Sequence, residues 1–148
     1  MRIFHTGPVG VGAIACFLVI VAFGAPADAT AQSFVDIPGN WYEVYSDNLG
    51  NVRVNDGTVD ARGSGVYEVW QHWHFDEPLS GAGATFDEML VRTEVDCRGA
   101  RERLVEFAVS LAGTDWQVAD VRYEWRDIGS TPRSDSAFNQ TCAFVEEI

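Results

Sequence analysis

The strongest chemical signal in the sequence is a pair of histidines in the run His72-Trp73-His74. Residues two apart on a β-strand project to the same face, so the two imidazoles would lie side by side, as paired metal ligands do. Glu68 shares that face, which makes a metal-dependent enzyme one hypothesis. The alternative is that both histidines are polar, half-buried neighbours of aromatic side chains. Because the only other histidine, His5, lies in the N-terminal leader described below, we prefer this alternative and expect no metal, no cofactor and no enzymatic activity.

Five tryptophans are many for a chain of 148 residues. They fit either an unusually bulky core or a binding surface, since tryptophan offers a large rigid area and one hydrogen-bond donor. The run Gly65–Phe75 carries bulky side chains at odd and even positions, and a strand points successive side chains to opposite faces. One set must therefore meet a second layer, a partner or solvent. We expect this set to be Trp70, His72 and His74, which form the candidate binding surface for a protein partner or a second copy of the chain.

The N-terminal segment predicts export from the cytoplasm. Arg2 precedes an almost entirely apolar run, Val9–Ala25, and small residues follow in two overlapping A-x-A arrangements over residues 27–31. This order is typical of a cleaved secretory signal. The alternative is a retained membrane anchor, but the run is shorter than the roughly 20 residues that a spanning helix needs. We therefore predict a signal peptide over residues 1–31, a single domain over residues 32–148 and no transmembrane segment after cleavage.

Cysteine usage agrees with export. Cys16 would leave with the signal peptide, so Cys97 and Cys142 are the only cysteines of the mature chain. An even pair of cysteines in an exported protein predicts a disulfide. The alternative is two free thiols.

The charge of the chain limits its partners. Ten arginines stand against 22 acidic residues, lysine is missing, and the formal net charge is −12. Such a surface repels phosphate backbones, so we expect no nucleic-acid partner. The missing lysine also excludes a P-loop and a Schiff-base enzyme.

Strand-like runs fill most of the chain after residue 40. Alternation with a period of two indicates half-buried antiparallel strands. Asp56-Gly57 suits a tight hairpin turn between the second and third runs. The runs are Trp41–Ser46, Val52–Asn55, Thr58–Ala61, Gly65–Phe75, Met89–Cys97, Arg103–Leu111 and Trp116–Trp125. They predict an antiparallel sheet of about six strands.

The period changes near the C-terminal end. Apolar and small residues fall at i, i+3, i+4 and i+7, which predicts a short helix over residues 134–146 with Ser134 as its N-cap. A disulfide between Cys97 and Cys142 would attach that helix to the sheet. The fold class is therefore α+β, mainly β, with one C-terminal helix and one disulfide. The expected core consists of Val91, Val95, Val105, Phe107, Val109, Phe138 and Val145.

A short motif near the start of the predicted domain resembles the opening of lipocalins. In that family a G-x-W motif leads into the first barrel strand, and here Gly39-Asn40-Trp41 matches it. The resemblance implies a lipocalin-like carrier of a small hydrophobic ligand, which is the alternative function.

A longer series of motifs resembles the surface-adhesin protein E-like family. It consists of an opening Trp strand, a D-x-x-G turn, a glycine leading into Val-Trp and an acidic strand ending in Asp-Cys with arginines after it. A final Trp then precedes a proline linker and a helix with the last Cys. In this chain the motifs are Trp41–Val44, Asp47–Gly50, Gly65 with Val69-Trp70, Glu94–Arg98, Trp125, Pro132 and Cys142.

The second resemblance implies a function as well as a fold. The fold is an antiparallel sheet backed by a C-terminal helix and closed by Cys97–Cys142. The location is the periplasm or the cell surface of a Gram-negative bacterium. The characterised adhesin of the family binds host matrix and serum proteins and can dimerise. We therefore expect an exported, adhesin-like binding module that recognises a protein partner through its sheet surface.

Overall fold

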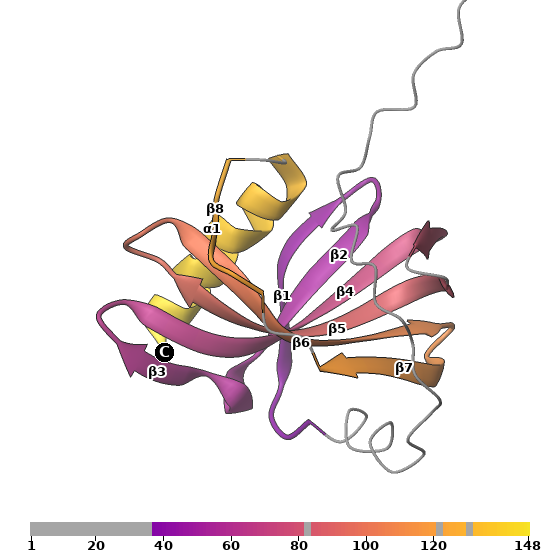
Figure 1. The fold of residues 1–148 in the computed structure, drawn as a ribbon, viewed down its shortest axis with the longest axis horizontal. Helices are drawn as coiled ribbons and strands as arrows, with labels where there is room; N and C mark the ends of the chain where they lie inside the picture. The colour runs from indigo at the N-terminus through magenta and orange to yellow at the C-terminus, as the bar shows by residue number, and fades with distance from the viewer. Residues whose placement is uncertain (1–36, 82–83, 121–122, 130–131) are drawn as a thin grey trace, which may run out of the picture.

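The computed structural model describes residues 37–81, 84–120, 123–129 and 132–148. They form one antiparallel sheet and one α-helix (Figure 1). Within this part of the chain, no helix has the length and apolar character needed to cross a membrane. The elements are β1 (Trp41–Asp47), β2 (Gly50–Asn55), β3 (Asp60–Gly63), β4 (Val66–Gly81), β5 (Ala84–Asp96), β6 (Arg101–Leu111), β7 (Thr114–Asp120), β8 (Arg126–Asp127) and α1 (Pro132–Glu147).

The sheet is built around the long meander β4–β5–β6. Six strands lie side by side in the order β1-β2-β4-β5-β6-β7, and the two short strands β3 and β8 pair with β4 and β6. The short strands, of four and two residues, give a sheet of eight strands where about six were predicted. The predicted fold class, a mainly antiparallel sheet with one C-terminal helix, is confirmed.

Strand β4 continues to Gly81, beyond Phe75, the last residue of the predicted strand. Its register with β5 shifts between His74 and Leu79. Pro78 lies in this irregular stretch, as expected for a residue that cannot donate a ladder hydrogen bond. Pairing resumes where Leu79 faces Phe86 and continues to Gly81 opposite Ala84, so the end of β4 pairs with the start of β5.

The predicted hairpin at Asp56-Gly57 is wrong. β2 pairs with β1 and β4, β3 pairs only with β4, and a short 3-10 turn connects β2 to β3. The Asp56 amide donates to the Asn40 carbonyl at 3.0 Å, and the Asp56 carboxylate accepts from the Asn40 amide at 2.7 Å. A Cβ on Gly57 would lie 2.7 Å from the Pro38 carbonyl oxygen. The dipeptide therefore anchors the chain ahead of β1 instead of closing a hairpin.

Two element boundaries also differ from the sequence prediction. The described part of the predicted strand Trp116–Trp125 ends as β7 at Asp120, residues 121–122 lie outside the described residues, and Tyr123–Trp125 are not in a strand. Helix α1 begins at Pro132, a residue that suits the first helical position. Ser134 is therefore inside the first turn and is not the N-cap.

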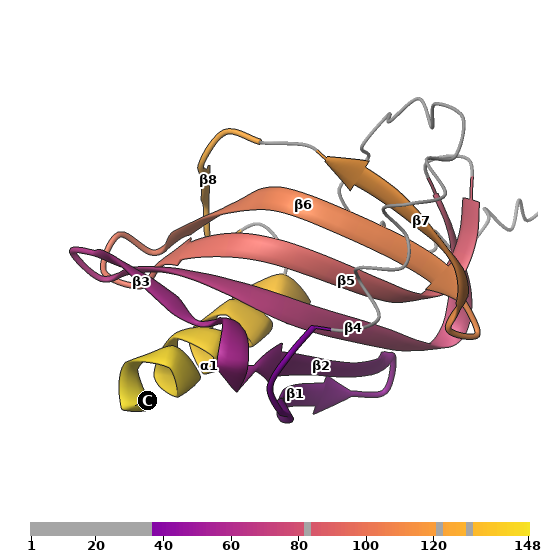
Figure 2. The same ribbon diagram turned by 90° about the horizontal axis from the view of Figure 1, so that it is seen from below.

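Helix α1 covers one face of the sheet, which we call the inner face (Figure 2). The opposite face is the outer face. The buried side of the helix follows the predicted period and consists of Ala137, Phe138, Thr141, Cys142 and Val145. Cys142 is bonded to Cys97, which follows β5, with the two Cα atoms 5.6 Å apart. The predicted disulfide is thus confirmed, and it joins the helix to the end of a central strand.

The main core lies on the inner face. Val54 and Val69 pack with Val145 of α1, and Val95 packs with Phe138. All of the predicted core residues are buried, with at most 5 % of each exposed: Val91, Val95, Val105, Phe107, Val109, Phe138 and Val145. The outer face is consequently the surface of the sheet that α1 leaves uncovered.

Candidate functional site

Alternation along β4 divides its side chains between the two faces. Gln71 points to the inner face, where its Nε2 donates to Thr141 Oγ1 of α1 at 2.9 Å. Because neighbouring residues of a strand alternate, Trp70, His72 and His74 lie on the outer face. This is the orientation that the sequence predicts.

Trp70 is part of a second apolar cluster on the outer face. The buried members of this cluster are Leu90 and Ala108. The half-buried residues packed against them are Ile37, Trp41, Trp70, Trp116 and Val118. They come from the start of the described chain and from β7 as well as from β4. The second set of bulky side chains on β4 therefore meets a layer that the chain itself supplies, and Trp70 is half-buried.

His72 and His74 share one acidic neighbour, Glu88 of β5. Glu88 Oε1 lies 3.9 Å from His72 Nε2 and 3.9 Å from His74 Nδ1. The side chain of His72 is only 20 % exposed, and its ring meets the Trp41 ring edge-on at 5.9 Å. Burial is the main cause that lowers the pKa of His72 to about 4, and the charges of Arg53 and His74 contribute to the same shift. In the described part of the chain, no group of three or more His, Cys, Asp or Glu side chains could hold a metal ion.

The buried His72 should make the protein less stable in acid. Unfolded chains protonate this residue near pH 6.5, whereas the folded protein does so near pH 4. Between these values the unfolded state binds more protons, so stability falls as the pH falls. The loss by pH 4 corresponds to about 3 kcal/mol. His72→Gln should remove this contribution, measured by urea unfolding from about pH 7 to pH 4, and His74→Gln is the more exposed control. An identical pH dependence in wild type and His72→Gln would contradict the prediction.

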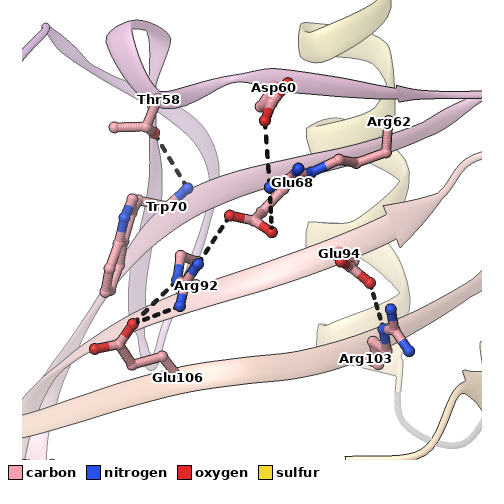
Figure 3. Close-up of polar contacts among 9 residues, drawn as sticks. All are labelled: Thr58, Asp60, Arg62, Glu68, Trp70, Arg92, Glu94, Arg103 and Glu106. Carbon is pink, nitrogen blue, oxygen red and sulfur yellow. Dashed lines mark hydrogen bonds and ion pairs between the residues drawn. The ribbon is translucent and has the colours of Figure 1, made fainter. Parts of the chain in front are cut away.

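A chain of ion pairs crosses the outer face from β3 to β6 (Figure 3). Arg62 Nη2 lies 3.2 Å from Asp60 and 2.9 Å from Glu68 Oε2. Arg92 Nη1 lies 3.0 Å from Glu68 Oε1, and Arg92 Nη2 lies 2.9 Å from Glu106 Oε2. Each arginine thus bridges two carboxylates. We call these five residues the ion-pair chain.

Within the ion-pair chain, the central carboxylate lies deeper than the guanidinium groups. The side chain of Glu68 is 12 % exposed, against 47 % for Arg62 and 30 % for Arg92. Burial by itself would lower the pKa of Arg92, but the hydrogen bonds and charges of Glu68 and Glu106 outweigh it and raise that pKa. Glu68, a candidate neighbour of the histidines from the sequence, is therefore engaged by arginines instead. The network fixes these side chains and presents guanidinium groups to solvent.

Two further arginines contact an indole ring at the β5–β6 end of the outer face. Arg103 Nε pairs with Glu94, and Arg101 Nε pairs with Asp96 at 2.8 Å. The guanidinium carbons of Arg101 and Arg103 lie 4.9 Å and 4.8 Å from the centroid of the Trp125 ring. These distances are within the range of cation–π interactions. We call Arg101, Arg103 and Trp125 the arginine–tryptophan site.

An open groove of about 340 Å³ connects the ion-pair chain to the arginine–tryptophan site. Sequence reasoning did not find this groove. The only sequence signal is that charged residues occupy the outward positions of β5, and such positions ordinarily face solvent. The lining residues are Arg62, Val66, Glu68, Arg92, Glu94, Arg103 and Trp125.

The geometry of the outer face is the basis for assigning a function. No family model, curated protein or solved structure matches this chain. Membership of the surface-adhesin protein E-like family therefore stays a prediction, and so does the signal peptide over residues 1–31, which lies outside the described residues. Because one fold hosts many functions, the assignment depends on the chemistry of the site.

Proposed function

We propose that the chain is an exported, adhesin-like binding module that recognises a protein partner through the outer face of its sheet. The groove is the observation that carries this proposal, because it combines arginines with Trp125 on an open surface. Arginine and tryptophan are enriched among the residues that dominate protein–protein binding energies. The disulfide supports an oxidising compartment. Together with the order of motifs, it supports the periplasm or cell surface of a Gram-negative bacterium and the protein E-like family.

Preorganisation of the outer face also supports a binding role. Association costs free energy for each flexible side chain that becomes immobilised at an interface. Arg62 and Arg92 are already held by two carboxylates each, and Arg103 is held by Glu94 and Trp125. These long side chains therefore have less freedom to lose when a partner binds.

The alternative function, a lipocalin-like carrier, requires a closed barrel around a cavity. Among the described residues, the path of strands ends at β1 and β7, which do not pair with each other. The groove lies open on one face of the sheet. Both observations favour the binding module over the carrier.

Removing exposed groups from the outer face should weaken partner binding without unfolding the protein. We expect the double variant Arg62→Ala/His74→Ala to bind at least about tenfold more weakly than wild type, because it truncates the most exposed arginine of the groove and the more exposed histidine of β4. The measurement is surface plasmon resonance of the exported protein against immobilised matrix and serum proteins and against itself. Circular dichroism reports whether the variant is folded.

The matched control for this experiment is Asn139→Ala/Gln140→Ala. It also truncates two polar side chains, but on the exposed side of α1. We expect it to bind as wild type does. Unchanged binding by a folded outer-face variant would contradict the proposal. A wild-type protein that binds neither itself nor any member of the panel would also contradict it.

A further inference from the structure

The arginines of the outer face differ in the number of carboxylates that they contact. Arg62 and Arg92 each contact two carboxylates. Arg101 and Arg103 each contact one, in both cases through Nε. Across the residues that the structure describes, the Nη atoms of Arg101 and Arg103 have no hydrogen bond or ion pair. Polar atoms that are both buried and without a partner do occur in this structure, but these Nη atoms are not among them. These donors are therefore open to solvent beside Trp125.

We propose that the arginine–tryptophan site binds a single carboxylate group, supplied by an acidic side chain in a peptide segment of the partner. This inference rests on the proposed function, because the peptide belongs to the protein partner. The two Nη atoms of a guanidinium form a planar fork that matches the two oxygens of a carboxylate. Arg101 and Arg103 present two such forks next to one indole ring.

An arginine that binds two carboxylates already occurs on the same sheet. Arg92 binds Glu106 through Nε and Nη2, and it uses Nη1 for a second carboxylate, Glu68. Arg101 and Arg103 each pair with one carboxylate through Nε, and their Nη atoms are unused. A carboxylate from a partner would be the second carboxylate at these arginines, as Glu68 is at Arg92, and here both Nη atoms are available to it.

Charge favours one carboxylate over a more highly charged anion. The pairs Arg101–Asp96 and Arg103–Glu94 are each neutral, so a bound carboxylate adds one negative charge close to Asp96 and Glu94. A dianionic phosphate would add two and would double the Coulomb repulsion from these residues. A polyanion would also be opposed by the net charge of −12, although salt screens this effect beyond about 10 Å. The segment that fits is therefore uncharged apart from one acidic residue.

The neighbouring surfaces suit the rest of such a segment. The aliphatic stem of a glutamate can lie along the indole of Trp125, which is half-buried. The groove of about 340 Å³ begins at Arg103 and Trp125 and has room for adjacent residues of the peptide. The ion-pair chain at its other end offers exposed guanidinium groups to peptide carbonyls.

N-acetylglutamate α-amide, which carries one side-chain carboxylate, is the probe for this site. We expect it to shift the indole N–H resonance of Trp125 in a saturable way, with a dissociation constant in roughly the millimolar range, as for a single charge-assisted contact. The signal is assigned with Trp125→Phe in the exported protein. N-acetylglutamine amide, the uncharged analogue, should give no saturable shift.

The variant Arg101→Lys/Arg103→Lys tests the role of the forks. It keeps a positive charge next to the buried Asp96 and Glu94, so the fold is preserved, but a lysine has no planar fork. We expect binding of the probe to weaken at least about tenfold. Arg98→Lys, at an exposed arginine outside the site, should bind as wild type does.

Three results would overturn the inference. They are an absent or non-saturable shift with the glutamate probe, an equal shift with the glutamine probe, and unchanged probe binding by the double lysine variant. Methyl phosphate binding more tightly than the glutamate probe would overturn the preference for a single carboxylate. If the lysine variant still binds the partner, the partner does not use the arginine–tryptophan site. The proposed function would stay intact, because it is tested with Arg62 and His74.

Discussion

Replacing Phe107 by alanine is expected to lower the free energy of unfolding by about 3–5 kcal/mol. Phe107 lies on β6 with 5 % of its surface exposed and forms a buried cluster with Val91 and Val109. Half-buried side chains, including those of Trp73 and Leu104, pack around this cluster. Truncation removes the transfer free energy of the ring and leaves a cavity that a sheet paired on both sides cannot close easily.

Urea unfolding followed by tryptophan fluorescence measures this loss. Leu111→Ala is the matched control, because Leu111 ends the same strand and is 45 % exposed. We expect the control to change stability by less than about 1 kcal/mol, as is usual for exposed positions. A similarly small change in Phe107→Ala would contradict the assignment of Phe107 to the core.

The central strands and the helix could be predicted because the spacing of their apolar residues indicates which side chains are buried. In β5 and β6 the inner-face positions are mostly apolar and the outer-face positions are mostly polar, so a shift of one residue would move a whole set of apolar side chains out of the core. In α1, Phe138, Cys142 and Val145 follow the helical period and are all buried. Local sequence is enough where one face of an element must avoid water.

The hairpin at Asp56-Gly57 could not be predicted because its partners are distant in sequence. The dipeptide suits a tight turn locally. In the structure it instead bonds and packs against Pro38 and Asn40, ahead of β1. Turn propensity does not report such tertiary contacts.

The candidate site was predictable in orientation but not in its contacts. Alternation places Trp70, His72 and His74 on one face. It does not reveal that Trp41 and Trp116, from other parts of the chain, pack against the same cluster. The exposure of a side chain on a sheet depends on which segments fold over it.

The ion-pair chain shows the same limit for charged residues. Arg92 lies directly opposite Glu106, whereas Glu68 faces Glu94, another acid. Like charges opposite each other destabilise a sheet. Arg92 and Arg103 relieve this repulsion by pairing with Glu68 and Glu94, and these contacts depend on register. A sequence without a known register gives the outward positions but not the partners.

Removing the disulfide is expected to lower the free energy of unfolding by roughly 4 kcal/mol in the chain-entropy model. The bond between Cys97 and Cys142 closes a loop with a sequence separation of 45, so the oxidised unfolded chain has fewer conformations than the reduced chain. Cys97→Ala, Cys142→Ala and the double variant should lose similar amounts, because each opens the same loop. Urea unfolding of the three variants and the oxidised protein measures the loss.

The location of the lost bond predicts which part of the protein responds. The disulfide joins α1 to the sheet on the inner face, whereas the ion-pair chain is built entirely on β3, β4, β5 and β6. Opening the loop should therefore loosen α1 first, and the outer face should keep its binding capacity for as long as the sheet remains folded. Intact-mass measurement after alkylation checks the premise. Two freely alkylated thiols in the unreduced exported protein would show that the bond does not form, and the predicted loss of stability would disappear with it.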